Sequence, residues 1–501
     1  MSGYVHDLLD QAAARRPDHP AVRTSEGVLT YGELEEQTRR LAHAFQSLGV
    51  RRGDRVALLL PNGIPVIAAL MAASRLGAVY VVINWGTKPF LLRHIVEDAA
   101  PRLMLTMESR LADVQEAVTV TDTQVLTVEG DWENLLAEAR LTAAPPQITQ
   151  DLASLIYTSG STGKPKAVMS THRNIRFAAA AIQQRLGMSE SDVVGLFLPL
   201  AFDYGLYQVF LTFQVGATLA LGSEQDAGPS LLRKLNEWQV TGLPLVPNLA
   251  HTLLRLCKRP NAVLPPLRFV TNTGAHLPFT YIDDINSLFE QVRVYVMFGL
   301  TECKRISILD PEDFQRKRRS VGTPLPDTEC LIVDESGQPL PEGEVGELVV
   351  RGPHVMGGYW NAPEITERRY RPFGDGGQIA LFTGDLVSMD EEGFLYFHGR
   401  SDDIYKQRGY RVSALEVEEA ALDIAGVRQA AVVPGVEEVG TVLFVTGDLT
   451  EEAALEQLHR RLEDAKMPDC VEVVDSFPIT NNGKTDKRKL AETYLEGRTI
   501  G

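Results

Sequence analysis

Eight residues, "SGSTGKPK" at positions 159–166, combine three small hydroxyl residues with two glycines and two lysines. Such a stretch could be a phosphate-binding loop, a flexible tether or a surface turn. It follows an apolar segment with strand character, residues 152–158, and precedes a pattern that becomes helical, residues 167–186. A turn between strand and helix suits phosphate, because glycine lets backbone N–H groups approach, hydroxyls donate and lysine supplies charge.

The best-known phosphate-binding pattern, GxxxxGK[ST], does not fit these residues. Aligning it on Gly163 and Lys164 requires glycine at position 158 and serine or threonine at position 165. The chain has Thr158 and Pro165 instead. If the stretch binds phosphate, it therefore belongs to a different class of loop.

The longer string "YTSGSTGKPKAV", residues 157–168, resembles the phosphate-binding loop of the adenylate-forming superfamily, which includes acyl-CoA synthetases, peptide-synthetase adenylation domains and luciferases. Further segments resemble motifs of that superfamily in the same order: "YVMFGLTE" at 295–302, "LFTGDL" at 381–386, "GRSDDIYKQRGYRVSALEVEE" at 399–419 and "PITNNGKTDKRKL" at 478–490. The resemblance extends over essentially the entire chain. It implies that a carboxylate attacks the α-phosphate of ATP to give an acyl-adenylate and pyrophosphate, and that a thiol then takes the acyl group.

The resemblance also implies roles in binding ATP and Mg²⁺. Glu302 has the position of the magnesium-coordinating glutamate, and Thr301 would donate to the α-phosphate. Asp385 would accept hydrogen bonds from the ribose hydroxyls, with Arg400 close by. Phe298, followed by Gly299, takes the place of the usual adenine-stacking tyrosine. The residues implied for the β- and γ-phosphates are Thr158, Ser159, Gly160, Ser161, Thr162, Gly163 and Lys166, and those implied for adenine are Gly274, Ala275 and His276.

The C-terminal motifs imply a lysine that acts in the first step and a hinge. Lys484 has the position of a lysine that bridges the substrate carboxylate, the α-phosphate and the ribose. Asp402 resembles the residue about which a small domain swings between the two half-reactions. Lys406 and Gly409 would then face the acyl site and the pantetheine tunnel in the second state.

The identity of the carboxylic acid depends on a less regular segment, "LPLAFDYGLYQVFL" at 198–211. A buried carboxylate needs a cation, so Asp203 indicates an amino-bearing acid, such as an α-amino, β-amino or aminoaryl acid, unless Asp203 is structural. Lys304 and Arg305 are expected at the rim of the pocket, where they could bind a second carboxylate or a polar substituent; alternatively, one of them faces inward and the other is structural. Further candidates for pocket lining are Tyr204, Tyr207, Asn248, Asn272 and Cys303.

The thiol acceptor is expected to be a separate molecule, because no carrier domain or attachment serine follows residue 490. A phosphopantetheine-bearing carrier protein is the first expectation. The segment "YRVSALEVEE", residues 410–419, is closer to the acyl-CoA synthetase form than to the peptide-synthetase form, which keeps free coenzyme A as an alternative. A luciferase-like oxygenase and an inactive scaffold are the other classes; intact Lys166, Glu302, Asp385 and Lys484 argue against the scaffold.

The elements that must position these residues follow an α/β pattern. Short apolar runs alternate with helical segments as far as about residue 400, and a compact α+β texture follows. We therefore expect a large N-terminal adenylation domain of β-sheets layered with helices, residues 1–400, and a small mobile α+β domain, residues 401–501.

Composition excludes several other classes of protein. The net charge of -17 disfavours a nucleic-acid partner, and the basic run at 314–320 is expected to be a solvated surface segment. No apolar run reaches the roughly 18 residues of a membrane span. The scattered cysteines form no disulfide framework or metal pair, and with no secretory signal in the sequence a cytoplasmic location is expected.

Overall fold

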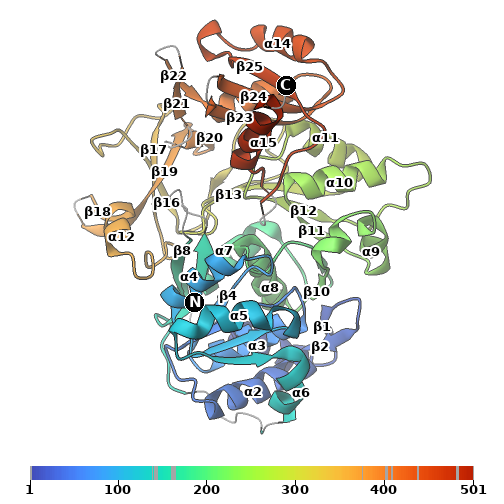
Figure 1. Cartoon of the computed structure of the whole chain (residues 1–501), viewed down its shortest axis with the longest axis vertical. Helices are drawn as coiled ribbons and strands as arrows, with labels where there is room; N and C mark the ends of the chain where they lie inside the picture. Colours follow the sequence, from blue (N-terminus) through green and yellow to red (C-terminus); the bar gives the residue numbers. More distant parts are fainter. Residues whose placement is uncertain are drawn as a thin grey trace. The chain divides into compact units, whose positions relative to one another are not determined.

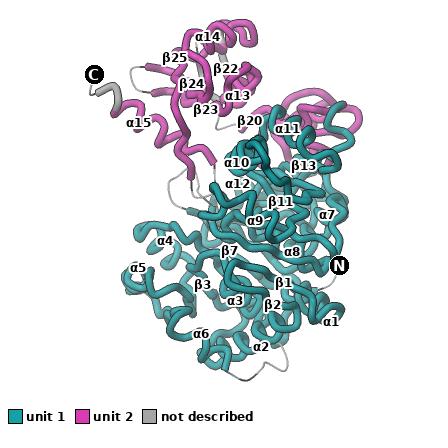
Figure 2. Tube along the Cα trace, turned by 90° about the vertical axis from the view of Figure 1, so that its right-hand side faces the viewer, with its two compact units in different colours: residues 1–315, 324–329, 350–381 teal, residues 316–323, 330–349, 382–501 magenta. Residues whose placement is uncertain are grey.

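The computed structural model describes residues 3–137, 139, 145–158, 165–374, 376–400, 404–407, 410–436, 439–480 and 484–499. The chain divides into two compact units, shown in different colours in Figure 2. Unit 1 comprises residues 1–315, 324–329 and 350–381; unit 2 comprises residues 316–323, 330–349 and 382–501. The α/β class is confirmed, whereas a domain boundary at residues 400 and 401 stays a prediction.

The first sheet of unit 1 carries the strand that enters the 159–166 stretch. Its strand order is β6-β5-β3-β4-β7-β8, and β8 alone of these runs antiparallel to its neighbour. Apart from Arg55 at the start of β3, β3 and β4 are buried apolar strands, as in other parallel sheets that helices cover: α3 packs on both strands and α2 packs on α3 (Figure 1). The strands are Gln124–Thr127, Leu103–Thr106, Arg55–Leu58, Val79–Val82, Leu152–Thr158 and Lys166–Thr171; the helices are α2 Tyr31–Ser47, α3 Ile64–Arg75, α4 Pro89–Ala99, α5 Leu111–Ala117 and α6 Val128–Ala137.

The second sheet of unit 1 has the order β15-β14-β13-β12-β11-β9-β10-β1-β2. Helix α8, Asp203–Val215, packs against β9 and β10. Its residues 203–213 are all buried, in accord with a mostly apolar sequence, and they include the polar residues Asp203, Gln208 and Thr212. The strands, in sheet order, are Thr323–Pro324, Ser307–Leu309, Arg293–Phe298, Phe269–Asn272, Gly242–Leu245, Val193–Leu196, Thr218–Leu221, Pro20–Arg23 and Val28–Thr30; the helices are α1 Asp7–Arg15, α7 His172–Leu186, α8, α9 Leu231–Glu237, α10 Pro247–Cys257 and α11 Phe279–Leu288. Helix α12, Pro363–Arg369, packs on β18, Tyr370–Phe373.

A third sheet has the order β16-β17-β19-β18, with β20 beside β19, and its strands are divided between the units. Its strands are Glu329–Val333, Gly346–Arg351, Gln378–Met389, Tyr370–Phe373 and Leu395–Arg400. The C-terminal part of unit 2 has its own apolar core, in which α13 and α14 pack on β23-β24-β25. These elements are β21 Ile404–Gln407, β22 Tyr410–Ser413, α13 Ala414–Leu422, β23 Val427–Val436, β24 Gly440–Gly447, α14 Glu451–His459, β25 Cys470–Val473 and α15 Lys487–Thr499.

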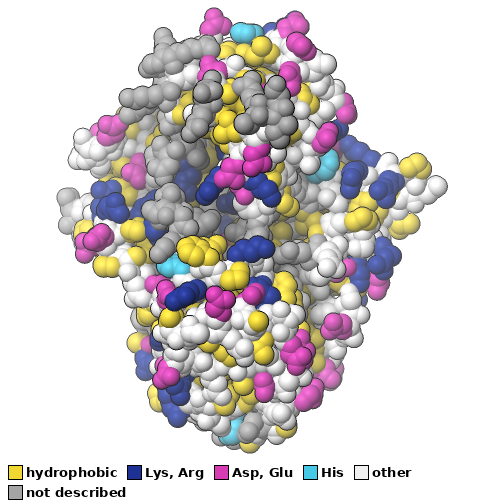
Figure 3. Space-filling model, in the orientation of Figure 1, with side chains coloured by type: hydrophobic (Ala, Val, Ile, Leu, Met, Phe, Trp, Pro, Cys, Tyr) yellow, Lys and Arg dark blue, Asp and Glu magenta, His cyan; other side chains and the backbone are white. Residues whose placement is uncertain are grey.

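The basic run of unit 2 is tied to neighbouring carboxylates. Lys317 Nζ lies 2.7 Å from Asp390 Oδ2 and 2.6 Å from Glu392 Oε1, and Arg316 pairs with Glu392. On the face shown in Figure 3, cationic and anionic side chains are interspersed in the same way. Within the described residues, no helix is both long and apolar enough to cross a membrane.

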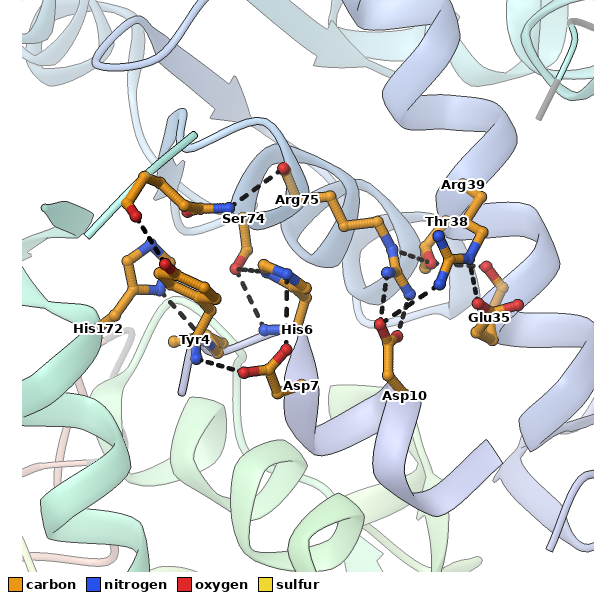
Figure 4. Close-up of polar contacts among 12 residues, drawn as sticks. Tyr4, His6, Asp7, Asp10, Glu35, Thr38, Arg39, Ser74, Arg75 and His172 are labelled. Carbon is orange, nitrogen blue, oxygen red and sulfur yellow. Dashed lines mark hydrogen bonds and ion pairs between the residues drawn. The ribbon is translucent and has the colours of Figure 1, made fainter. Parts of the chain in front are cut away.

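A buried polar network joins the N-terminal segment to helices α1, α2, α3 and α7 (Figure 4). Arg75 Nη1 donates to Asp10 Oδ2 at 2.8 Å, and the backbone N–H of Val5 donates to His172 Nδ1 at 3.1 Å. Burial lowers the pKa of His172 to about 4 and holds that of His6 well below its usual value. Both imidazoles are therefore neutral members of the core near neutral pH.

Candidate functional site

The described ends of the 159–166 stretch lie on two paired strands. β7 and β8 are antiparallel, and Thr158 stands opposite Lys166 in their register. The predicted turn from strand to helix is therefore wrong: the residues after the stretch pair as a strand, and helix α7 begins only at His172. Ser159, Gly160, Ser161, Thr162 and Gly163 lie outside the described residues.

Helix α4 holds both ends of this hairpin connection. Tyr157 Oη donates to Asp98 Oδ2 at 2.7 Å, and His94 Nε2 lies 3.1 Å from the carbonyl oxygen of Pro165. His94 and Asp98 are one helical turn apart on α4, so one helix contacts both a residue just before the 159–166 stretch and a residue near its end. Thr158 and Lys166, the described members of the predicted phosphate site, are consequently fixed at the paired ends of β7 and β8.

A tight turn after β13 brings the predicted adenine, magnesium and substrate residues into one segment. Strand β13 ends at Phe298, and Gly299 passes so close to Lys304 that a Cβ at position 299 would lie 1.9 Å from the Lys304 carbonyl oxygen. Lys304 itself has a φ of 63°, in the left-handed region that non-glycine residues seldom adopt. The turn places Thr301 and Glu302, both half-buried, between the two.

Glu302 is held through its side chain and its backbone. Tyr359 Oη donates to Glu302 Oε1 at 2.6 Å, and the N–H of Met356 donates to the Glu302 carbonyl oxygen at 2.9 Å. Within the described residues, no group of three or more histidine, cysteine or acidic side chains could hold a metal. A single carboxylate fits Mg²⁺ that is bound mainly by nucleotide phosphates and water.

The residues predicted to select the acid form a buried charged cluster, Asp203, Lys304 and Arg305. Lys304 Nζ lies 3.8 Å from Asp203 Oδ2, and the two side chains are 2% and 7% exposed. Arg305 is 5% exposed and its Nη1 donates to the Lys304 carbonyl oxygen at 3.0 Å. Both cations are therefore buried, and the predicted position at the rim of a pocket is wrong.

Aromatic rings line this cluster. The Lys304 ammonium lies 5.4 Å from the ring centre of Tyr207, and the Arg305 guanidinium lies 5.1 Å from that of Tyr204. Tyr204 is fixed by a 2.7 Å hydrogen bond from its hydroxyl to the Thr271 carbonyl oxygen. Among the described residues, Lys304 Nζ, Arg305 Nε and the Tyr207 hydroxyl have no hydrogen-bond partner.

Burial dominates the electrostatics of this cluster. It lowers the pKa of Lys304 and of Arg305, and the charge of Asp203 acts in the opposite direction on both. Unpartnered buried donors are costly unless something accepts from them. Within the described residues, the donors of this cluster are therefore not fully compensated.

The other predicted adenine and lining residues lie on neighbouring segments. Asn272 ends β12 and donates through Nδ2 to the Leu245 carbonyl oxygen at 3.1 Å, and Asn248 is in the first turn of α10. Gly274 has a φ of 84°, which suits glycine at the bend after β12, followed by Ala275. His276 is exposed and packs edge-on against Phe279, whereas Cys303 is fully buried.

In unit 2, the predicted ribose residues stand opposite each other on β19 and β20. Asp385 Oδ1 lies 3.6 Å from Arg400 Nε, and the Asp385 side chain is buried. Lys484 is exposed, and its backbone forms reciprocal hydrogen bonds with Thr480. Lys406 lies on β21 but its side chain is outside the described part, as are Asp402 and Gly409. The roles of all these residues stay predictions.

Residues 9–360 match the family model "AMP-binding enzyme", and residues 416–484 match "AMP-binding enzyme C-terminal domain". The chain therefore belongs to the AMP-binding enzyme family and is a ligase of the adenylate-forming superfamily that activates a carboxylic acid with ATP. The resemblance seen in the sequence motifs is confirmed.

Three proteins illustrate what the chain is similar to. Surfactin synthase subunit 2 of Bacillus subtilis is 28% identical over 96% of the chain, and a long-chain-fatty-acid–CoA ligase of Escherichia coli O6:H1 is 29% identical over 97%. The chain spans 14% of the first protein and 94% of the second. The crystal structure of VinN is 41% identical, with a TM-score of 0.74, and covers 79% of this chain and 99% of its own; a second structure is a complex of VinN with L-aspartate.

Two features of the site were not found from the sequence. Tyr359, 57 positions beyond Glu302, showed no local signal for its contact with that residue. Tyr80, on β4, is fully buried and close enough to Tyr207 to contribute, after burial itself, to the raised pKa of that tyrosine. In the sequence, Tyr80 is one residue of the apolar run that forms β4, and such a run predicts only a buried strand.

Proposed function

We propose that this ligase adenylates an amino-bearing carboxylic acid with a second acidic group and transfers it to the phosphopantetheine thiol of a separate carrier protein. The observation that carries the proposal is the buried cluster of one carboxylate and two cations, Asp203, Lys304 and Arg305. A simple fatty acid would offer these groups no compensating charge.

Charge pairing favours an amino dicarboxylic acid over a simple amine. If a substrate ammonium pairs with Asp203, Lys304 loses its counter-ion within the described structure. A second carboxylate on the same substrate would restore a partner to Lys304 and bond to Arg305, whose Nε lacks one. The complex of VinN with L-aspartate, an amino dicarboxylic acid, supports this class of substrate.

The first half-reaction brings the substrate carboxylate, an anion, against the negatively charged phosphates of ATP, so their charge must be neutralised. An oxygen of the reacting carboxylate forms a bond to the α-phosphorus while the bond to the bridging oxygen of pyrophosphate breaks. Lys166 would bind the outgoing phosphates, Lys484 would neutralise charge at the α-phosphate, and Glu302 would hold Mg²⁺. When bound, Mg²⁺ neutralises phosphate charge and orients the nucleotide.

In the second half-reaction, the thiol sulfur bonds to the acyl carbon and AMP leaves with the electron pair of the acyl–oxygen bond. The similarity to surfactin synthase subunit 2 favours a carrier protein. Coenzyme A is the second candidate, favoured by residues 410–419 and by the similarity to the long-chain-fatty-acid–CoA ligase.

Two experiments test these two steps. ATP–pyrophosphate exchange should be promoted by aspartate-like acids and far less by the corresponding amino acids without the second carboxylate or by fatty acids. Exchange with fatty acids alone would overturn the role of Asp203. Mass spectrometry of products formed with a carrier protein or with coenzyme A would then identify the acceptor.

A further inference from the structure

The side chain of Glu302 is held by a partner that the sequence motifs do not include. Its Oε1 accepts a 2.6 Å hydrogen bond from Tyr359, and its backbone carbonyl accepts from Met356. Glu302 lies in a turn, outside helices and strands, so its side chain would otherwise sample several rotamers. The contact selects one carboxylate orientation.

Tyr359 is itself fixed firmly enough to perform this role. It is 6% exposed, its ring packs edge-on against Tyr370 at 6.0 Å, and its N–H donates to Thr366 Oγ1 at 2.9 Å. Gly358 makes this possible, because it has a φ of 105° and a Cβ there would lie 2.3 Å from Thr366 Cγ2.

The segment that carries Tyr359 is also paired with β8, the strand that leaves the predicted phosphate loop. Met169 donates to the Gly358 carbonyl oxygen at 3.0 Å, and Trp360 donates to that of Ala167 at 2.9 Å. Residues 356–360 therefore contact both the turn at Glu302 and the strand that begins at Lys166.

We propose that Tyr359 is a positioning residue for the metal site: its hydroxyl holds Oε1 of Glu302, which would leave the other carboxylate oxygen to bind the metal. This inference rests on the proposed function, in which Glu302 holds Mg²⁺. Hydrogen bonds to a ligating carboxylate restrict its orientation, and losing such a partner typically costs roughly 10–100-fold in metal affinity or activity.

The test measures metal binding directly and does not depend on turnover. Mn²⁺ is titrated into the full-length protein with a non-hydrolysable ATP analogue, and free Mn²⁺ is followed by electron paramagnetic resonance. We expect Tyr359→Phe to weaken Mn²⁺ binding about 10-fold. In pyrophosphate exchange, the same variant should recover at raised Mg²⁺, whereas Glu302→Gln should not.

Matched variants separate a specific effect from general loosening. Tyr370→Phe and Trp360→Phe alter aromatic neighbours but leave the Glu302 hydrogen bond in place, so both should bind Mn²⁺ like the wild type. Wild-type Mn²⁺ affinity in Tyr359→Phe, or an equal loss in either control, would overturn the inference. Wild-type affinity in Glu302→Gln would instead show that the metal assignment in the proposed function is wrong.

Discussion

The carboxylate of Asp203 and the ammonium of Lys304 face each other at 3.8 Å in the interior of unit 1. This distance is too long for a hydrogen bond, and Lys304 Nζ has none among the described residues. Two buried charges that are not hydrogen-bonded to each other recover only part of their desolvation cost. Under the proposed function, a charged substrate would replace this weak mutual pairing with hydrogen-bonded partners of its own.

Replacement of Asp203 tests its role in substrate binding. In Asp203→Asn, an ammonium group would face a neutral amide, and removing one partner of a buried charge pair costs about 2–5 kcal/mol. We expect kcat/KM for exchange with the amino acid to fall by roughly two to three orders of magnitude. Unchanged kcat/KM would show that Asp203 is structural.

Gly299 should tolerate no larger residue. In Gly299→Ala, the new Cβ would overlap the backbone carbonyl of Lys304, which cannot move as a flexible side chain would. We expect a destabilisation of about 1–3 kcal/mol and a loss of exchange activity, because the turn carries both Glu302 and Lys304. Denaturant unfolding and exchange assays check this; Gly27→Ala, at a position with open space and no left-handed φ, controls for a general glycine effect.

Stability should fall as the pH decreases from about 6.5 to about 4, because of buried histidines. The pKa of His172 is about 4 in the fold, so in this interval the unfolded chain binds a proton that the folded chain does not. The loss should reach about 3 kcal/mol for His172 and level off at lower pH. His172→Gln, whose amide oxygen can accept from Val5, should flatten this part of the stability profile; an unchanged slope would contradict the assignment.

Lys484 is predicted to act in the first half-reaction only. Lys484→Ala should nearly abolish pyrophosphate exchange, while transfer from preformed acyl-adenylate to the thiol is comparatively intact. Exchange and single-turnover transfer are measured on the same preparation. Lys487, three residues further on, pairs with Glu418 on α13, and Lys487→Ala serves as a matched control. Wild-type exchange in Lys484→Ala would contradict the prediction.

The motifs predicted the family, because loops that bind nucleotides leave local patterns of glycine, hydroxyl and charge, and the alternation of apolar runs with helical segments predicted the α/β class. The sequence did not predict that residues 166–171 pair with β7, because a short apolar run before a helix fits both the two-residue repeat of a strand and the 3.6-residue repeat of a helix. Nor could it show that Lys304 and Arg305 are buried, because long cationic side chains are usually exposed. The contact between Tyr359 and Glu302 depends on tertiary packing alone.

Under the proposed function, Asp203 and Lys304 together select an acid with both an ammonium and a second carboxylate. The most direct measurement is ATP–pyrophosphate exchange by the wild type, Asp203→Asn and Lys304→Met with three acids of similar length: an amino dicarboxylic acid, its analogue without the amino group and its analogue without the second carboxylate. We predict that the wild type prefers the first acid by at least about 100-fold, that Asp203→Asn loses discrimination for the amino group, and that Lys304→Met loses it for the second carboxylate. Equal exchange by the wild type with all three acids would contradict the account.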